Sequence, residues 1–70
     1  MTINSSEDFG RAVRDRRKVL GYTQAELAAF TGFSVSFLSD LERGKKTAEL
    51  EKAIIIANTL GMDLELNRRG

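Results

Sequence analysis

Four glycines divide this chain into segments of helical length, and no proline interrupts them. Gly21, Gly32, Gly44 and Gly61 follow one another at intervals of 11, 12 and 17 residues. A glycine directly after an apolar pattern is a common C-terminal stop of a helix. Because the intervals suit helices and the chain has no helix-breaking proline, this spacing predicts an all-α fold.

Residues that start helices lie at the matching positions. Thr23 and Glu26 have the spacing of a capping box, and Ser5-x-x-Asp8 is similar to one. Ser34 and Thr47 are further N-cap residues. Together with the glycine stops, these signals predict four helices over about 6–20, 24–31, 35–43 and 48–60.

The period of the apolar residues predicts which face of each helix is buried. Apolar residues recur at the 3.6-residue spacing of an amphipathic helix, and Phe33 between the second and third helices is expected to fill the core. The predicted core consists of Phe9, Ala12, Val13, Leu20, Leu27, Ala28, Thr31, Leu38, Leu41, Leu50, Ala53, Ile54, Ala57 and Leu60. Ile55 points away from this stripe, and we expect it at a protein-partner surface.

The C-terminal segment MDLEL has a different pattern, because apolar and acidic residues alternate with period two. That pattern is typical of a β-strand, and a single strand cannot satisfy its own backbone. Since MTIN at the start is a weak partner, we expect residues 62–67 to pair with the same strand of a second copy. The predicted dimer interface is Ile56, Met62, Leu64 and Leu66. A free tail on a monomer and a dimer through the fourth helix alone are the alternatives.

Composition limits the classes of function. Seventy residues make one domain at most, and the chain has neither histidine nor cysteine. The commonest acid–base residue and metal ligand are therefore missing, so we expect no enzyme, no cofactor and no metal site. No apolar run approaches the ~20 residues of a membrane span, and no signal peptide is recognisable, which predicts a cytoplasmic protein without a membrane partner. The net charge is only +1, but residues 1–22 carry five cations against three acids, which allows a local basic face.

The segment YTQAELAAFTGFSVSFLSDLERGK places two short helices around a tight turn at Gly32, which is the helix-turn-helix layout. It resembles the Cro/phage-repressor (XRE) type helix-turn-helix family. The matching positions are Thr23, Gln24, Leu27, Ala28, Gly32, Ser34, Leu38, Leu41, Glu42, Gly44 and Lys45. The resemblance covers about residues 6–61 and implies a compact DNA-binding bundle of four or five helices. We therefore expect one domain over 1–70, with residues 62–67 as a dimerisation strand.

More narrowly, FLSDLERGKKTAEL, the following apolar helix and the tail LGMDLEL look like the HipB-like antitoxins. Those are small dimeric repressors that partner a HipA-like kinase toxin. The resemblance implies a homodimeric, sequence-specific repressor that binds an inverted-repeat operator in double-stranded DNA and autoregulates its operon. A solitary phage-type or restriction-controller regulator is an alternative. A protein-interaction module that does not bind DNA is an alternative of another class, favoured by the low net charge and the acidic Asp40.

The resemblance also implies roles for individual residues. The base-contacting residues are Val35, Ser36, Asp40 and Ser39, of which Val35 suits a thymine methyl, Ser36 any base edge and Asp40 the amino group of cytosine. The phosphate-contacting residues are Gln24, Ser34, Phe37, Arg43, Lys45 and Lys46. Phe37 is expected to be exposed, either on a sugar–phosphate edge or on a neighbouring helix. Arg17 and Glu42 are expected to form a structural ion pair that sets the angle of the third helix.

Overall fold

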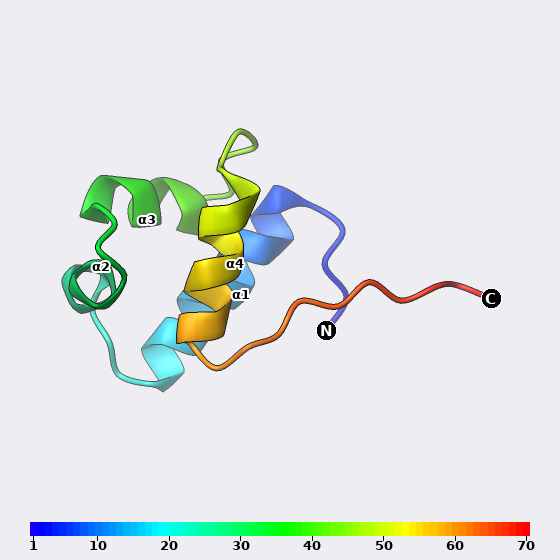
Figure 1. The fold of residues 1–70 in the computed structure, drawn as a ribbon, viewed down its shortest axis with the longest axis horizontal. Helices are drawn as coiled ribbons and strands as arrows, with labels where there is room; N and C mark the ends of the chain where they lie inside the picture. The colour runs from blue at the N-terminus through cyan, green and yellow to red at the C-terminus, as the bar shows by residue number, and fades with distance from the viewer.

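A computed structural model describes all residues 1–70 and contains four helices and no strand (Figure 1). The helices are α1 (Ser6–Val19), α2 (Gln24–Thr31), α3 (Val35–Glu42) and α4 (Leu50–Thr59). These bounds confirm the four predicted helices to within two residues at each end. None of the helices is long and apolar enough to cross a membrane.

The helix starts follow the predicted caps in three of four cases. The hydroxyl groups of Ser5, Thr23 and Ser34 each accept a hydrogen bond from a backbone N–H in the first turn of α1, α2 and α3. For α4 the prediction of Thr47 is wrong, because Glu49 is the N-cap and its side chain forms no capping bond. The predicted stops are confirmed, since all four glycines have φ between 78° and 88°.

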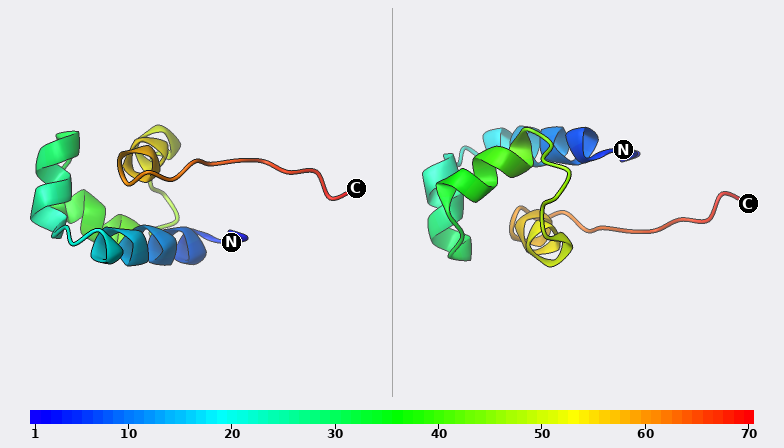
Figure 2. Two further views of the ribbon diagram at one scale, coloured as in Figure 1. Left: turned by 90° about the horizontal axis from the view of Figure 1, so that it is seen from below. Right: turned by 90° about the horizontal axis from the view of Figure 1, so that it is seen from above.

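The N-terminal half of α1 packs directly against the C-terminal end of α3, at Gly10. Figure 2 shows α1 lying lengthwise with α3 running beside it, whereas α4 is seen nearly end-on. A Cβ atom added at Gly10 would lie 2.4 Å from the carbonyl oxygen of Leu41 and 2.7 Å from that of Glu42. The missing side chain therefore permits the close approach that places α3 on α1.

The core lies where the four helices meet and differs from the prediction in its α4 residues. Its fully buried side chains are Val13, Leu27, Leu38, Ile56 and Leu60. Ile56 was predicted to contact a second copy, which is wrong because its side chain is 0% exposed within this chain. The core stripe of α4 is Ala53, Ile56, Ala57 and Leu60, which has the 3.6-residue spacing without Leu50.

Three other predicted core positions are corrected by the structure. Leu50, the first residue of α4, is 70% exposed, and Leu20, the C-cap of α1, is 39% exposed. Ile54 is only half-buried. Phe33 packs against the buried cluster, as predicted. Ile55 is exposed on the outer side of α4.

The predicted C-terminal strand is absent. Met62 is half-buried and its N–H donates to the carbonyl oxygen of Ala57, but the residues after it are exposed and form no backbone hydrogen bonds. Figure 1 shows this tail leaving the bundle as an extended segment. A strand requires a second strand hydrogen-bonded beside it, and no backbone hydrogen bond joins the residues after Met62 to another segment.

Candidate nucleic-acid interface

Residues 32–34 join α2 to α3 in a tight turn whose geometry is fixed on both sides. Gly32 has φ = 78°, and its N–H donates to the carbonyl oxygen of Ala28 at 2.8 Å. This left-handed conformation is readily adopted by glycine and strained for most other residues. On the other side of the turn, the Ser34 hydroxyl accepts from the N–H of Phe37 at 3.0 Å. The direction in which α3 starts is therefore set by local sequence.

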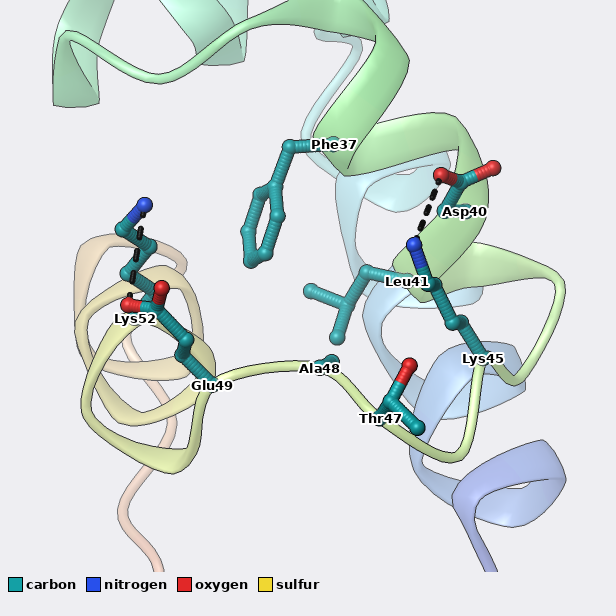
Figure 3. A pocket seen from close by; sticks show the side chains of 8 residues that line it. All are labelled: Phe37, Asp40, Leu41, Lys45, Thr47, Ala48, Glu49 and Lys52. Atoms are coloured by element: carbon teal, nitrogen blue, oxygen red, sulfur yellow. Dashed lines mark ion pairs between the residues drawn. The ribbon is translucent and has the colours of Figure 1, made fainter.

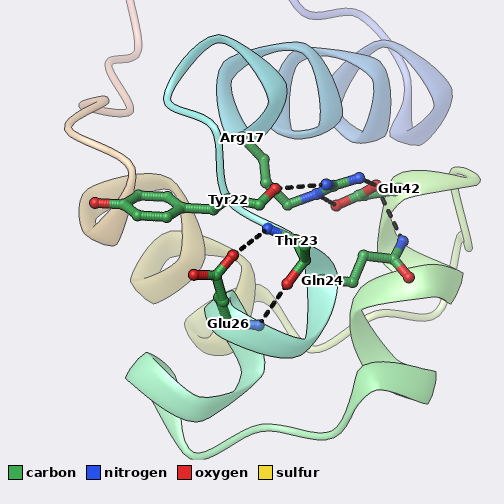
Figure 4. A network of polar contacts seen from close by, with 6 residues as sticks. All are labelled: Arg17, Tyr22, Thr23, Gln24, Glu26 and Glu42. Carbon is green, nitrogen blue, oxygen red and sulfur yellow. Dashed lines mark hydrogen bonds and ion pairs between the residues drawn. The ribbon is translucent and has the colours of Figure 1, made fainter.

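The far end of α3 is held by a buried ion pair with α1, between the two residues predicted to pair. Arg17 donates from Nε to Glu42 Oε2 at 2.7 Å and from Nη2 to Glu42 Oε1 at 2.9 Å (Figure 4). The remaining guanidinium nitrogen, Nη1, donates to the carbonyl oxygen of Tyr22 at 2.8 Å. This bidentate arrangement fixes orientation as well as distance, so α3 cannot rotate freely on α1.

The charged state of this pair is favoured despite its burial. Burial raises the pKa of the Glu42 carboxyl, but hydrogen bonds from Arg17 and Gln24, with the charges of Arg17 and Arg14, lower it by more. The net pKa of Glu42 therefore lies below its ordinary value. The hydrogen bond to Glu42 likewise raises the pKa of Arg17. Both side chains are thus ionised around neutral pH.

Gln24 links the ion pair to the start of α2. Its Nε2 donates to Glu42 Oε1 at 3.1 Å, so the side chain is held toward α3. The capping box at Thr23 and Glu26 occupies the N–H groups of both those residues. The N–H groups of Gln24 and Ala25 have no acceptor within the chain. Free N–H groups at a helix N-terminus favour an anion such as a phosphate.

The outer face of α3 carries short side chains and is open to solvent. Val35 and Ser36 are exposed, and Ser39 and Asp40 are half-buried. Ser36 lies opposite the buried residues Leu38 and Leu41 on α3, and Val35, Ser39 and Asp40 flank it. The structure therefore brings together the four residues predicted to contact bases. The Ser34 hydroxyl is exposed at the start of the same helix.

Phe37 is not exposed, which corrects the prediction. Its ring is half-buried and packs edge-on against Phe33, with the ring centroids 5.5 Å apart. Lys52 of α4 places its Nζ 5.5 Å from the Phe37 centroid and 5.6 Å from the Phe33 centroid. Figure 3 shows the Phe37 ring pointing from α3 toward α4. Of the two alternatives for Phe37, the structure supports packing on a neighbouring helix.

Three cations follow the outer face of α3. Arg43, Lys45 and Lys46 are all exposed, and Lys46 lines a groove with Ser6 and Phe9 of α1. Arg43 Nη2 donates to Asp40 Oδ1 at 3.0 Å, and Lys45 Nζ lies 3.6 Å from Asp40 Oδ2. Lys46 forms no ion pair.

Three features that position α3 and its outer face were not predicted from the sequence. Gly10 interrupts an otherwise good helix pattern, and a glycine inside a helix costs about 1 kcal/mol, which is a signal of close packing. Asp40 and Arg43 have the i, i+3 spacing of a helical ion pair. The contact of Gln24 with Glu42 joins residues 18 positions apart and has no local signal.

Comparisons with known proteins agree with this geometry. A sequence profile of the helix-turn-helix family matches residues 13–67. The chain is 38% identical over 64 residues to an uncharacterized HTH-type transcriptional regulator, y4mF, of Sinorhizobium fredii (strain NBRC 101917 / NGR234), which covers 91% of this chain and 84% of the relative.

Solved structures with the same fold include a HipB-O4 20mer complex and a HipA-HipB-O2-O3 complex. The TM-score is 0.90 and the sequence identity 24% in both cases. Both comparisons cover 100% of this chain and 99% of the solved chain. At this identity the likeness establishes a shared fold.

Proposed function

Because this chain belongs to the helix-turn-helix family, we propose that it is a transcriptional regulator that binds double-stranded DNA in a sequence-specific way. In such proteins the second helix of the motif lies in the major groove, and here that helix is α3. No enzymatic activity is part of this proposal. The protein acts in the cytoplasm.

One observation carries the proposal: α3 is fixed rigidly at both ends while its outer face is left free. The Ser34 cap and the Arg17–Glu42 ion pair fix the helix, and Val35 and Ser36 on its outer face are exposed. A rigid helix with an unoccupied face can present short side chains to base edges in a fixed register.

We assign direct readout to the residues along that face. Ser36 donates to or accepts from a base edge, Val35 covers a thymine methyl, and Ser39 and Asp40 extend the contact toward the end of α3. Phosphate contacts come from Gln24 and the free N–H groups at the start of α2, from the Ser34 hydroxyl, and from Arg43, Lys45 and Lys46. Because the Phe37 ring packs against Phe33, we assign it a supporting position and no phosphate contact.

We further propose that the protein acts as a homodimer on an inverted-repeat operator. A two-fold dimer presents two recognition helices about 34 Å apart, one turn of DNA. Two observations support self-association through the tail. Leu64 and Leu66 are exposed apolar residues, and Leu64 lines an apolar groove with Phe9, Leu50 and Ala53. Small domains often gain stability by association.

Within this class, we propose that the chain is the antitoxin of a HipA/HipB-like pair that represses its own operon. The support is the full-length fold likeness to HipB chains solved in a HipB-O4 20mer complex and in a HipA-HipB-O2-O3 complex. A solitary regulator has the same interface with DNA. The two are distinguished by co-purification of the tagged protein with the product of its neighbouring gene: a HipA-like kinase that co-purifies supports the antitoxin, and no such kinase gene contradicts it.

The DNA-binding proposal is tested by an electrophoretic mobility shift with the DNA upstream of the gene. We expect a shifted complex that resists competition by random duplex of the same length. A matched pair of variants, Ser36→Ala on the outer face of α3 and Thr59→Ala at the exposed end of α4, locates the interface. Only Ser36→Ala should weaken the complex. If the wild-type protein forms no complex, the interaction-module alternative is favoured.

A further inference from the structure

Asp40 occupies both of its carboxylate oxygens with cations that also serve the proposed phosphate contacts. Oδ1 accepts from Arg43 Nη2 at 3.0 Å, and Oδ2 lies 3.6 Å from Lys45 Nζ. Figure 3 shows the Lys45 side chain extending from the loop after α3 toward the carboxylate. Asp40 therefore pairs with two of the three cations at this end of the interface, and its single negative charge offsets one of their two positive charges.

These ion pairs contribute little to the fold. The side chains of Asp40, Arg43 and Lys45 are 36%, 74% and 53% exposed. Ion pairs in such positions are screened by solvent and salt and have small effects on stability. Arg43 donates to Asp40 from Nη2 alone, so this pair lacks the second hydrogen bond of a bidentate contact. A role outside folding is the better explanation for a carboxylate placed on the surface that we propose faces DNA.

We propose that Asp40 determines specificity by withholding Arg43 and Lys45 from phosphate until a base edge takes up its carboxylate. This inference rests on the proposed DNA-binding function. On a matching site, the amino group of a cytosine donates to Asp40 and replaces the cations as its partner. Arg43 and Lys45 are then released to the phosphate backbone, and each contact releases counterions.

On a non-matching site the exchange does not occur. A base edge that offers only acceptors cannot bond the carboxylate, so Asp40 keeps its two cations and they stay withheld from the phosphates. Cationic contacts to phosphate supply the affinity for non-specific DNA. Withholding two of these cations therefore weakens binding to non-specific DNA more than binding to the operator. The acid therefore acts against binding at wrong sequences.

The test compares wild-type protein and Asp40→Asn on the upstream DNA and on a random duplex, over a series of salt concentrations. We expect Asp40→Asn to bind the random duplex about 3- to 10-fold more tightly and to lose most of its preference for the upstream DNA. The slope of log K against log salt on the random duplex should become steeper by about one to two, as for one or two added phosphate contacts. Asp15→Asn on the exposed face of α1, where Asp15 forms no ion pair, is the matched control and should change nothing.

A second background separates the withholding of cations from simple repulsion. If Asp40 acts through its partners, Asp40→Asn has no effect on the salt slope when Arg43 and Lys45 are both replaced by glutamine. An equal gain in affinity in that background overturns the proposal, and so does an Asp40→Asn protein that behaves like the control. Failure of the wild-type protein to prefer its upstream DNA would instead contradict the proposed function, and this inference with it.

Discussion

Glu42, the last residue of α3, illustrates how much of this interface depends on single side chains. Its carboxylate accepts from the guanidinium of Arg17 and from the amide of Gln24, and both Arg17 and Glu42 are buried. Removal of one partner of a buried pair leaves an uncompensated charge, whereas removal of both leaves none. Loss of Arg17 or Glu42 alone should therefore destabilise the fold strongly, whereas loss of both should cost less than the sum of the two single losses.

We predict that Arg17→Ala and Glu42→Ala each lower the free energy of unfolding by about 3 kcal/mol or more, and that the double variant loses less than the sum. Urea unfolding at neutral pH measures all three. Arg11→Ala serves as a control, because its ion pair with Asp8 is exposed. Additive losses in the double variant would contradict a direct interaction between Arg17 and Glu42.

The same carboxyl predicts how stability depends on pH. The pKa of Glu42 in the folded protein lies below its ordinary value of 4.5, so the unfolded chain takes up the proton first as pH falls. Its contribution is therefore complete above about pH 4.5 and is lost as pH falls through the folded value. We expect the stability difference between wild type and Glu42→Gln to shrink between pH 5 and pH 3. A difference that stays constant over this range would show that Glu42 is not the titrating group.

At the scale of elements, the sequence was most informative where the signals are local. Caps such as Thr23 and stops such as Gly32 act within one turn, and the four predicted helices agree with the structure. The phase of α4 was misjudged, since three consecutive isoleucines allow more than one apolar stripe and only packing selects Ile56. The alternation of apolar and acidic residues over 62–67 predicted a strand, but the pattern holds no information on whether a second strand lies beside it, and the structure contains none.

The site shows the same division. The family resemblance predicted the pairing of Arg17 with Glu42 and the outer face of α3, on which Val35 and Ser36 are exposed. The inward position of Phe37 depends on Lys52 and Phe33 from other elements. The contact of α1 with α3 depends on Gly10, whose significance appears only when the two backbones meet.

That contact leads to a prediction about α3 as an element. In an isolated helix, Gly→Ala stabilises by about 1 kcal/mol, but at Gly10 the added Cβ would collide with backbone carbonyls that no side-chain rotation can move. We expect Gly10→Ala to lower the free energy of unfolding by about 1–3 kcal/mol, and to weaken DNA binding because α3 must shift. Thermal unfolding and the mobility shift measure the two effects. A variant more stable than wild type would contradict the tight packing of α1 on α3.

At the scale of the whole molecule, the proposed regulator needs two copies on one operator. Leu64 and Leu66 in the tail are exposed apolar residues that a second copy can cover. A chain truncated after Gly61 keeps all four helices and the core. It should sediment as a monomer at concentrations where the full chain is a dimer, and bind the full operator at least 10-fold more weakly. A truncated chain that is still dimeric would place the interface elsewhere, for example on α4.

The most direct test of DNA recognition by α3 is selection of bound sequences from a random pool of duplex DNA, with the wild-type protein and Ser36→Ala in parallel. We predict that the wild-type protein enriches an inverted repeat whose half-sites are centred about 10 base pairs apart. Ser36→Ala should enrich a repeat of the same spacing that has lost its preference at one position in each half-site. Enrichment of the same sequence by both proteins, or of no sequence by the wild type, would contradict the placement of α3 in the major groove.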